Sequence, residues 1–211
     1  MQYVSVMVVT YNSANTIIET LTSILEQSIG GRNIELIISD DCSQDNTINV
    51  VNDWIKIYRD DFYDVKLLTK EKNEGVSANC NAGWKICTGT WIKSIGGDDL
   101  LLKECLAEFI CYVSKNTSCS AVFSYMEWFG NIKKITPEPY NLRFFELSAS
   151  EQHEYLMFKS FNIAPTSFIK KSALEDVGFA DQQYTLIEDL PLWIRFTKNG
   201  YKLHFMPKLT V

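Results

Sequence analysis

Apolar residues in the first half of the chain follow two alternating patterns. Residues 3–9, 34–39, 65–69 and 91–95 are short, nearly continuous runs rich in β-branched side chains, which is typical of strands covered on both faces. Between them, residues 17–25, 45–58 and 77–87 carry apolar side chains at helical spacing. Because strands alternate with helices, we predict an α/β fold with a mostly parallel central sheet flanked by helices.

The second half of the chain is less regular. We predict helices over 101–114, 151–161 and 187–198, strands over 121–129, 167–170 and 203–211, and a loop over 133–143, which contains two prolines. No repeat or linker divides the chain, so a single domain over residues 1–211 is expected. Its end directly after a predicted strand indicates a piece cut from a longer protein at the C-terminus.

Composition narrows the class of protein. The 211 residues are 46% hydrophobic and 22% charged, as in ordinary globular domains, and the net charge of −6 argues against a nucleic-acid surface. No signal peptide and no apolar run of membrane-spanning length is recognisable. Six cysteines without a CxxC pair, beside two histidines, argue against zinc and predict reduced, buried thiols in a cytoplasmic protein.

One predicted turn carries two adjacent carboxylates directly after two glycines. Gly96 and Gly97 follow a predicted strand and are followed by the adjacent carboxylates Asp98 and Asp99. In one interpretation this is a solvated turn in which Asp99 caps a helix that begins near Leu101. In the other, the paired carboxylates hold a hard divalent cation that carries phosphate oxygens. The turn by itself favours the first interpretation.

Polar loops also follow the other predicted strands, and ligands of open parallel sheets bind beyond the carboxyl ends of the strands. Their shared placement favours a nucleoside diphosphate, with Tyr11 on the base and Asp40 or Asp41 on base or ribose. Packing, capping and turn formation are the alternative roles for these residues. The candidate nucleotide-binding residues are Thr10, Tyr11, Asn12, Asp40, Asp41, Asn73, Gly75 and Asp98.

A further acidic pair opens the last predicted helix. Glu188 and Asp189 lie in its first turn, where the helix dipole favours carboxylates. The alternative is a general base that deprotonates an acceptor hydroxyl. The local sequence alone favours the capping role.

Four stretches together resemble the inverting family 2 glycosyltransferases of GT-A fold. They are VSVMVVTYNSANTIIETLTSILEQS, IELIISDDCSQDNT, KNEGVSANCNAGWKICTGTWIKSIGGDDLL and IEDLPLWIRFTKNGY. The resemblance implies a Rossmann-like nucleotide-binding fold in which Tyr11 stacks on the base and the loop of Asp40 and Asp41 contacts base or ribose. It implies that Asp98 faces the ribose, that Asp99 and Asp98 bind Mg²⁺ or Mn²⁺, and that Asp189, with Glu188 beside it, is the catalytic base.

The resemblance also implies two substrates, a sugar donor and an acceptor, and a separate half of the chain that binds each. Residues 1–100 would bind a nucleotide-diphosphate sugar, UDP-linked by preference, and residues 101–211 a saccharide or lipid-linked saccharide acceptor. Such a chain would act in polysaccharide or glycoconjugate synthesis, in the cytoplasm at the inner face of the membrane, with peripheral membrane association and no nucleic acid. Gly96 departs from the family's D-x-D-D pattern, which lowers the expected metal affinity.

Two other functions are compatible with parts of this pattern. A non-catalytic nucleotide-sugar-binding scaffold would explain the carboxylate missing at Gly96. A sugar-phosphate nucleotidyltransferase would need a glycine-rich basic loop, which residues 10–15 lack. Aromatic residues such as Trp128, Phe129 and Tyr140 could contact sugars or lipid headgroups, although core packing is the simpler expectation. On the acceptor side, the loop 130–147 would determine acceptor choice.

Overall fold

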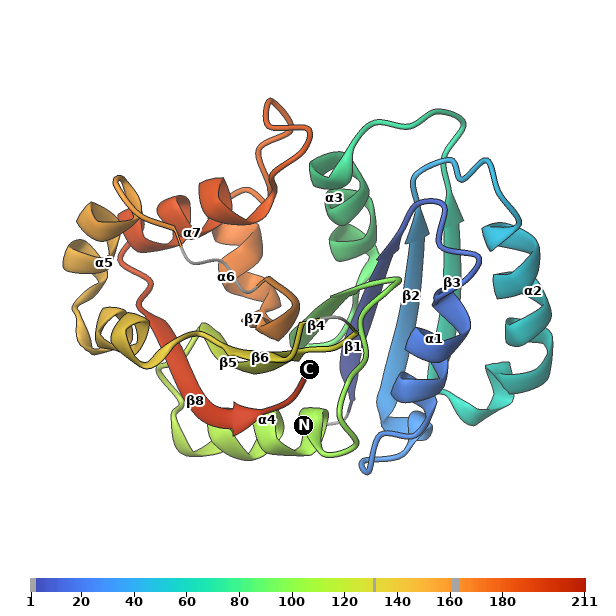
Figure 1. Ribbon diagram of the computed structural model, residues 1–211, viewed down its shortest axis with the longest axis horizontal. Helices are drawn as coiled ribbons and strands as arrows, with labels where there is room; N and C mark the ends of the chain where they lie inside the picture. The colour runs from blue at the N-terminus through green and yellow to red at the C-terminus, as the bar shows by residue number, and fades with distance from the viewer. Residues whose placement is uncertain (1–2, 131, 161–163) are drawn as a thin grey trace.

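One mixed sheet runs through the computed structural model, which describes residues 3–130, 132–160 and 164–211 (Figure 1). Its strand order is β3-β2-β1-β4-β7-β5-β6, with β8 beside β5. The strands are β1 (Val4–Thr10), β2 (Ile34–Asp40), β3 (Asp64–Thr69), β4 (Trp91–Gly96), β5 (Ala121–Trp128), β6 (Lys134–Thr136), β7 (Phe168–Lys170) and β8 (Leu203–Leu209).

Most of this sheet is parallel, as predicted. Strands β2 and β4 pair with the two sides of β1 in parallel, and β3 pairs with β2 in parallel. Strand β7 is antiparallel to both β4 and β5, and β8 runs parallel to β5. The short β7 therefore joins the parallel first half of the chain to the second half within one sheet.

Helices cover both faces of the sheet and explain why its central strands are buried. Every residue of β2 is buried, and α3 packs on β1 and β2. The helices are α1 (Ile17–Leu25), α2 (Thr47–Tyr58), α3 (Val76–Ile86), α4 (Cys105–Lys115), α5 (Ala149–Leu156), α6 (Lys171–Asp176) and α7 (Asp189–Lys198). Short 3₁₀ helices are η1 (Gly31–Asn33), η2 (Arg59–Asp61), η3 (Pro139–Glu146) and η4 (Ala164–Thr166).

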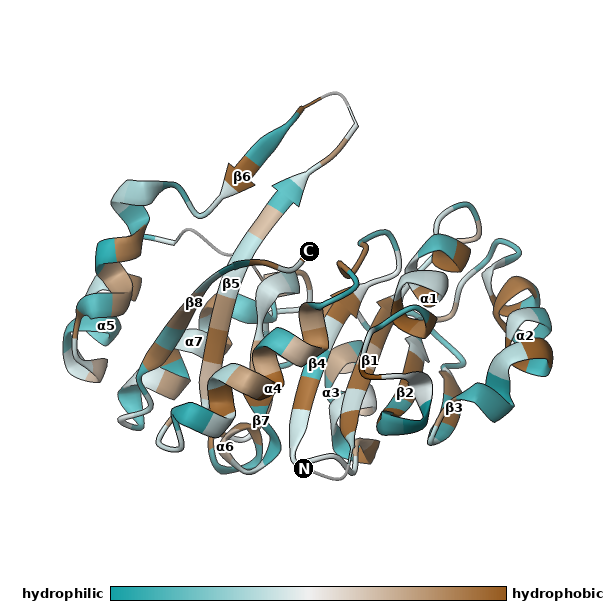
Figure 2. Ribbon diagram, turned by 90° about the horizontal axis from the view of Figure 1, so that it is seen from below, coloured by the Kyte–Doolittle hydropathy of each residue, from teal (hydrophilic) through white to brown (hydrophobic). Residues whose placement is uncertain are grey.

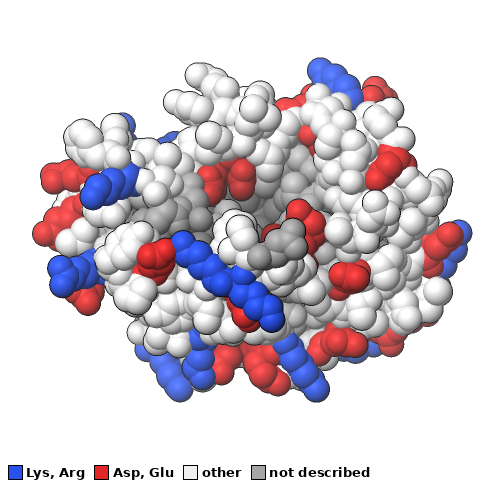
Figure 3. All heavy atoms as spheres, viewed as in Figure 1, with Lys and Arg blue, Asp and Glu red and all other residues white. Residues whose placement is uncertain are grey.

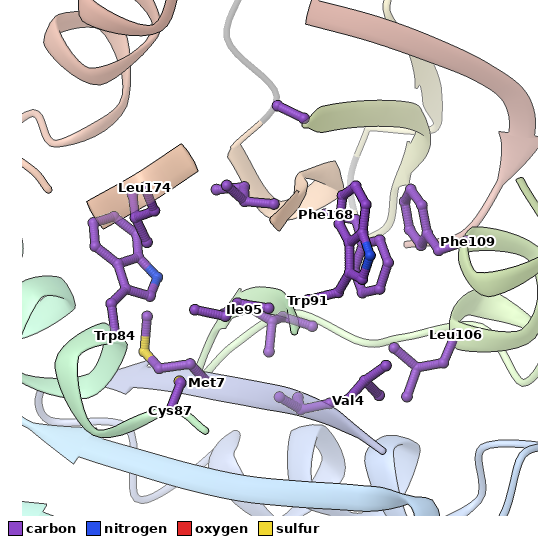
Figure 4. Close-up of a cluster of buried hydrophobic side chains, with 14 of the residues drawn as sticks. Val4, Met7, Trp84, Cys87, Trp91, Ile95, Leu106, Phe109, Phe168 and Leu174 are labelled. Atoms are coloured by element: carbon purple, nitrogen blue, oxygen red, sulfur yellow. The ribbon is translucent and has the colours of Figure 1, made fainter. Parts of the chain in front are cut away.

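An aromatic stack ties the two halves of the molecule together (Figure 4). The rings of Trp91 in β4 and Phe168 in β7 stack with centroids 5.1 Å apart, and Phe109 of α4 lies 5.0 Å from Phe168. All three side chains are at least 94% buried, so they exclude water from the junction between β4 and β7. This stack fixes the second half of the chain against the amino end of β4, where Trp91 begins the strand.

The helix predicted over 101–114 begins four residues later, at Cys105. Leu101 and Leu102, which precede it, bond to distant partners: Leu101 N–H donates to Ser23 Oγ, and Leu102 N–H donates to the Thr210 carbonyl. These long-range bonds give the N–H groups of Leu101 and Leu102 hydrogen-bond partners outside any helix. Asp99 therefore does not cap this helix, and the capping interpretation of the turn at residues 96–99 was wrong.

Three further details differ from prediction. The region 133–143, predicted as a loop, contains β6 and most of η3, and the short α6 was not predicted. The predicted helix 151–161 spans Ala149–Leu156, and residue 161 lies outside the described residues. All six cysteines are free thiols, but Cys111 is exposed and Cys42 half-buried, so burial was correct only for the other four.

Strands β5 and β6 form a hairpin that projects from the body of the molecule (Figure 2). Apolar side chains at this hairpin are exposed, including Trp128, Phe129, Ile132 and Ile135. No helix in the described part of the chain is long and apolar enough to cross a bilayer.

Candidate active site

The loops after β1, β2 and β4 meet at one edge of the sheet because their strands end in register. Thr10 pairs with Asp40, and Val9 pairs with Gly96. Gly97 N–H donates to the Val9 carbonyl over 2.9 Å, which carries the turn after β4 back against β1. The predicted convergence of these loops is present.

Tyr11 and Asn12 occupy the loop after β1 in different ways. The Tyr11 side chain is 48% exposed at the sheet edge, where its ring face is accessible to a ligand. Asn12 has a φ of 53° and is held by the second loop: its N–H donates to Ser43 Oγ, and its Oδ1 accepts from Gln44 N–H, both at 2.8 Å. Asn12 thus links the two loops, and Tyr11 presents an aromatic surface beside them.

Asp40 and Asp41 are both almost fully buried and are engaged within the protein. Asp40 accepts hydrogen bonds from the N–H and hydroxyl of Ser43. Asp41 accepts from Gly75 N–H at 2.8 Å and forms an ion pair with Lys70 at 3.0 Å. The two carboxylates therefore organise the loops around the expected nucleotide position, and their contact with base or ribose stays a prediction.

Gly75 connects this edge of the sheet to the second half of the chain. Its φ is +87°, and a Cβ at this position would lie 2.4 Å from the Thr185 carbonyl oxygen. Val76 N–H donates to the same carbonyl at 2.9 Å, and Ser77 Oγ donates to the Tyr184 carbonyl. Glycine is required for this close approach. Neighbouring Asn73 accepts a bond from Gly75 N–H at 3.2 Å and is exposed.

The carboxylates of Asp98 and Asp99 converge above Gly96. A Cβ built on Gly96 would lie 2.8 Å from Asp98 Oδ1 and 3.1 Å from Asp99 Oδ2. The glycine therefore provides the space into which both carboxylates turn. Burial, and then the charge of Asp98, raise the pKa of the Asp99 carboxyl.

Glu188 and Asp189 mark the start of α7. Glu188 makes no side-chain capping bond, and Asp189 Oδ1 accepts from the adjacent Leu190 N–H at 2.6 Å. Burial raises the pKa of both carboxyl groups. A raised pKa makes the ionised carboxylate a stronger base. Neither carboxylate closes the first turn of α7 in the manner of an N-cap, so the capping role has little support.

Two cavities meet between Asp99 and Asp189. The first, of about 330 Å³, is lined by Gly96, Asp99, Glu188 and Asp189 and by apolar side chains beneath them. The second, of about 650 Å³, opens on the side of β5 and is lined by Trp128 and others, again with Asp99 and Asp189. Figure 3 shows acidic groups inside the hollow between the two halves of the molecule. One cavity could hold a donor and the other an acceptor, with both carboxylates at the junction.

Sequence reasoning missed a buried lysine directly behind this junction. Lys93 in β4 is fully buried, and its ammonium group donates to the carbonyls of Ser94 (2.8 Å) and Pro165, both of which line the first cavity. Burial lowers the pKa of Lys93 to about 8, while the nearby Cys105 and Asp99 act in the opposite direction. A single charged residue inside the predicted buried strand of residues 91–95 was the available signal.

A divalent cation is compatible with the donor set at Gly96. No cluster of three or more potential ligands among His, Cys, Asp and Glu occurs in the described residues. Asp98 and Asp99 nevertheless supply hard oxygen atoms, and cations that bind together with substrate phosphates need only one or two protein carboxylates. The residues present therefore fit a phosphate-bound cation better than a site built entirely from protein ligands.

The fold of this chain is shared with solved glycosyltransferases. S. aureus TarS in complex with UDP-GlcNAc superposes with a TM-score of 0.79 at 21% identity, over 99% of this chain and 57% of TarS. The mannosyltransferase PcManGT from Pyrobaculum calidifontis, in complex with GDP-Man and Mn²⁺, gives a TM-score of 0.76 at 20% identity, over 99% of this chain and 56% of that one. These similarities establish a GT-A fold.

Sequence comparison gives the family. Residues 5–178 match the model of glycosyl transferase family 2, and the chain belongs to this family. It is 28% identical to EpsE of Bacillus subtilis (strain 168), over 94% of this chain and 68% of EpsE. It is 26% identical to the UDP-Glc:alpha-D-GlcNAc-diphosphoundecaprenol beta-1,3-glucosyltransferase WfaP of Escherichia coli, over 96% of this chain and 73% of WfaP. The chain thus spans about seven tenths of these relatives and less than three fifths of the solved structures above.

Proposed function

We propose that this protein transfers a sugar from a nucleotide-diphosphate sugar, UDP-linked by preference, to a hydroxyl group of a saccharide or lipid-linked saccharide, with inversion at the anomeric carbon. The observation that carries the proposal is the position of Asp99 and Asp189, which come from opposite halves of the chain and line the same two cavities. Family membership and the named donors of TarS and WfaP support the class of donor.

The donor would bind at the edge of the sheet formed by residues 1–100. Tyr11 offers a ring face for the base, and the loop held by Asp41 and Gly75 would surround base and ribose. Thr10, Asn12, Asp40 and Asn73 would complete this surface, on which Asn12 and Asp40 also order the loops. Asp98 would face the ribose.

Mg²⁺ or Mn²⁺ would be held by Asp99 and Asp98. When bound, the cation would supply charge neutralisation for the departing diphosphate. The convergence of both carboxylates over Gly96 supports this role, because repulsion between adjacent carboxylates is relieved by a cation. The complex of PcManGT with Mn²⁺ supports it by analogy of fold.

Asp189 would act as the general base, with Glu188 beside it. The acceptor hydroxyl gives its proton to the Asp189 carboxylate while its oxygen forms a bond to the anomeric carbon. The bond from that carbon to the diphosphate oxygen breaks on the opposite face, and its electron pair leaves with the diphosphate. This single displacement depends on positioning and on electrostatic stabilisation. Burial of Asp189, which raises its pKa, supports the assignment.

The acceptor side would be formed by residues 101–211, through the cavity next to Trp128. WfaP, whose name specifies a diphosphoundecaprenol-linked acceptor, supports a lipid-linked saccharide as one acceptor class. Such an acceptor would place the reaction in the cytoplasm at the inner face of the membrane, with peripheral association of the protein. The product would belong to a cell-surface polysaccharide or glycoconjugate.

Product formation distinguishes this function from a nucleotide-sugar-binding scaffold. The protein is incubated with UDP-glucose or UDP-GlcNAc, Mn²⁺ and a panel of saccharide acceptors, and mass spectrometry detects the added hexose or N-acetylhexosamine. We expect transfer to an acceptor or slow hydrolysis of one donor. Tight donor binding with neither transfer nor hydrolysis would support the scaffold instead. The nucleotidyltransferase alternative is excluded by family membership.

A further inference from the structure

We infer that the groove between η3 and α5 is a second saccharide-binding site, which holds an oligosaccharide acceptor beyond the residue that reacts. The inference rests on the proposed function for the identity of the acceptor, but the groove itself is a feature of the fold. It has a volume of about 600 Å³ and is lined by Tyr140, Asn141, Phe158 and Lys159, among others.

Two aromatic rings of this groove are unusually exposed. The side chain of Tyr140 is 69% exposed, and that of Phe158 is 90% exposed. A phenylalanine left in water contributes almost nothing to the stability of the fold, since its apolar surface stays hydrated. Exposed aromatic groups beside a concave polar surface are typical of binding sites. Both residues therefore point to a ligand with flat apolar faces.

The groove adjoins the cavity at Asp99 and Asp189 across the hairpin of β5 and β6. In the hairpin, Met126 lies opposite Thr136, and Trp128 lies opposite Lys134. Side chains of directly opposed residues in an antiparallel pair stand on the same face. Met126 and Trp128 line the cavity at the carboxylates, and Thr136 and Lys134 line the groove. A ligand that leaves the carboxylates along this face of the hairpin reaches the groove.

A hydrogen bond orients the side chain of Trp128 at the boundary between the cavity and the groove. The indole N–H of Trp128 donates to Thr136 Oγ1 at 3.3 Å. The bond holds the ring of Trp128 between the cavity and the groove, where a second sugar unit would pass. An acceptor of several sugar units can then place its terminal hydroxyl at Asp189 and its remaining units over Trp128 and Tyr140.

The chemistry of the groove fits a sugar chain. The C–H faces of a pyranose ring are apolar and stack on aromatic rings, while its hydroxyls need hydrogen-bond partners. Asn141 and Lys159 supply such partners next to Tyr140 and Phe158. Lys134 is paired with Glu138, so the groove does not present a concentrated positive charge for a polyanion.

The test uses defined oligosaccharides and needs no donor. Cellotetraose, maltotetraose and chitotetraose are compared with glucose and N-acetylglucosamine by saturation-transfer NMR and titration. We expect at least one tetrasaccharide to bind about tenfold more tightly than its monosaccharide, and the double variant Y140A/F158A to lose this advantage. The variant Tyr63→Ala is the matched control, because Tyr63 is also exposed but lies beside β3 in the other half.

Each remaining outcome contradicts the inference. Equal binding of tetrasaccharides to wild type and Y140A/F158A, or no binding of any tetrasaccharide, would overturn it. Loss of binding to vesicles of phosphatidylglycerol and phosphatidylethanolamine in Y140A/F158A, without loss of saccharide binding, would assign the aromatic pair to a membrane. Thermal unfolding checks that the double variant is folded. UDP binding is measured separately, so a protein without nucleotide affinity would refute the proposed function and not the groove.

Discussion

Asp99, at the turn after β4, and Asp189, the first residue of α7, line the same two cavities although they belong to opposite halves of the chain. The aromatic stack of Trp91, Phe109 and Phe168 holds the halves together at the amino end of β4, the opposite end of this strand from the site. Burial raises the pKa of both carboxyl groups, and for Asp99 the charge of Asp98 adds to the shift. We propose different roles for the two carboxylates, metal binding for Asp99 and proton transfer for Asp189, because their neighbours differ.

Replacement of Asp189 by Asn should abolish most of the transfer activity. Loss of a general base typically slows a reaction about 10²- to 10⁴-fold, while UDP binding at the other side of the site should be unchanged. Initial rates and calorimetric titration with UDP measure the two effects. Glu188→Gln is the matched control and should retain more activity. Full activity of Asp189→Asn would refute its assignment as the base.

Replacement of Asp99 by Asn should weaken UDP binding in the presence of Mn²⁺ by roughly tenfold or more, since the cation loses a charged ligand. In the presence of EDTA the same substitution should have little effect. Calorimetry with and without Mn²⁺ measures this difference. If wild type and variant bind UDP equally with Mn²⁺, Asp99 is not a metal ligand.

Gly75 and Gly178 offer a matched pair for testing the link between the two halves. Both have positive φ, but only a Cβ at Gly75 would meet a neighbour, the Thr185 carbonyl oxygen. Gly178→Ala should cost about 1 kcal/mol from backbone strain alone, and Gly75→Ala distinctly more. Denaturant unfolding gives the two free energies. Equal losses would show that the approach of Gly75 to Thr185 is not important for stability.

The buried Lys93 should make stability depend on pH in the alkaline range. Its pKa is lowered by burial from 10.5 to about 8 in the folded protein, so the unfolded chain binds more protons between these values. Stability relative to the variant Lys93→Met should therefore rise as pH increases from about 8 to about 10.5, by up to about 3 kcal/mol.

Denaturant unfolding of wild type and Lys93→Met at several pH values measures this difference. Contributions of titrating groups that do not interact with Lys93 cancel in the comparison, because both proteins contain them; Cys105 and Asp99 do interact with it. A difference that stays constant between pH 8 and pH 10.5 would mean that the Lys93 pKa is not lowered in the folded state.

Much of the fold was predictable because it is encoded locally. The runs that became β1, β2, β3 and β4 are continuous and apolar, and the helices between them have clear periodicity. Prediction failed where long-range hydrogen bonds replaced local ones. Residues 101 and 102 stay outside the helix because their N–H groups bond to Ser23 and Thr210, and β6 forms because it pairs with β5.

By itself the sequence determined the alternation of strands and helices in the first half of the chain, the family, and the polar residues at the strand ends. It left the turn at Gly96 open between a helix cap and a cation site, and local patterns favoured the cap. Only the tertiary structure excluded the cap, brought Asp99 to Asp189, and placed Lys93 behind them. The reason is physical: periodicity reports which residues are buried, whereas distances between sites depend on packing of segments that are remote in the chain.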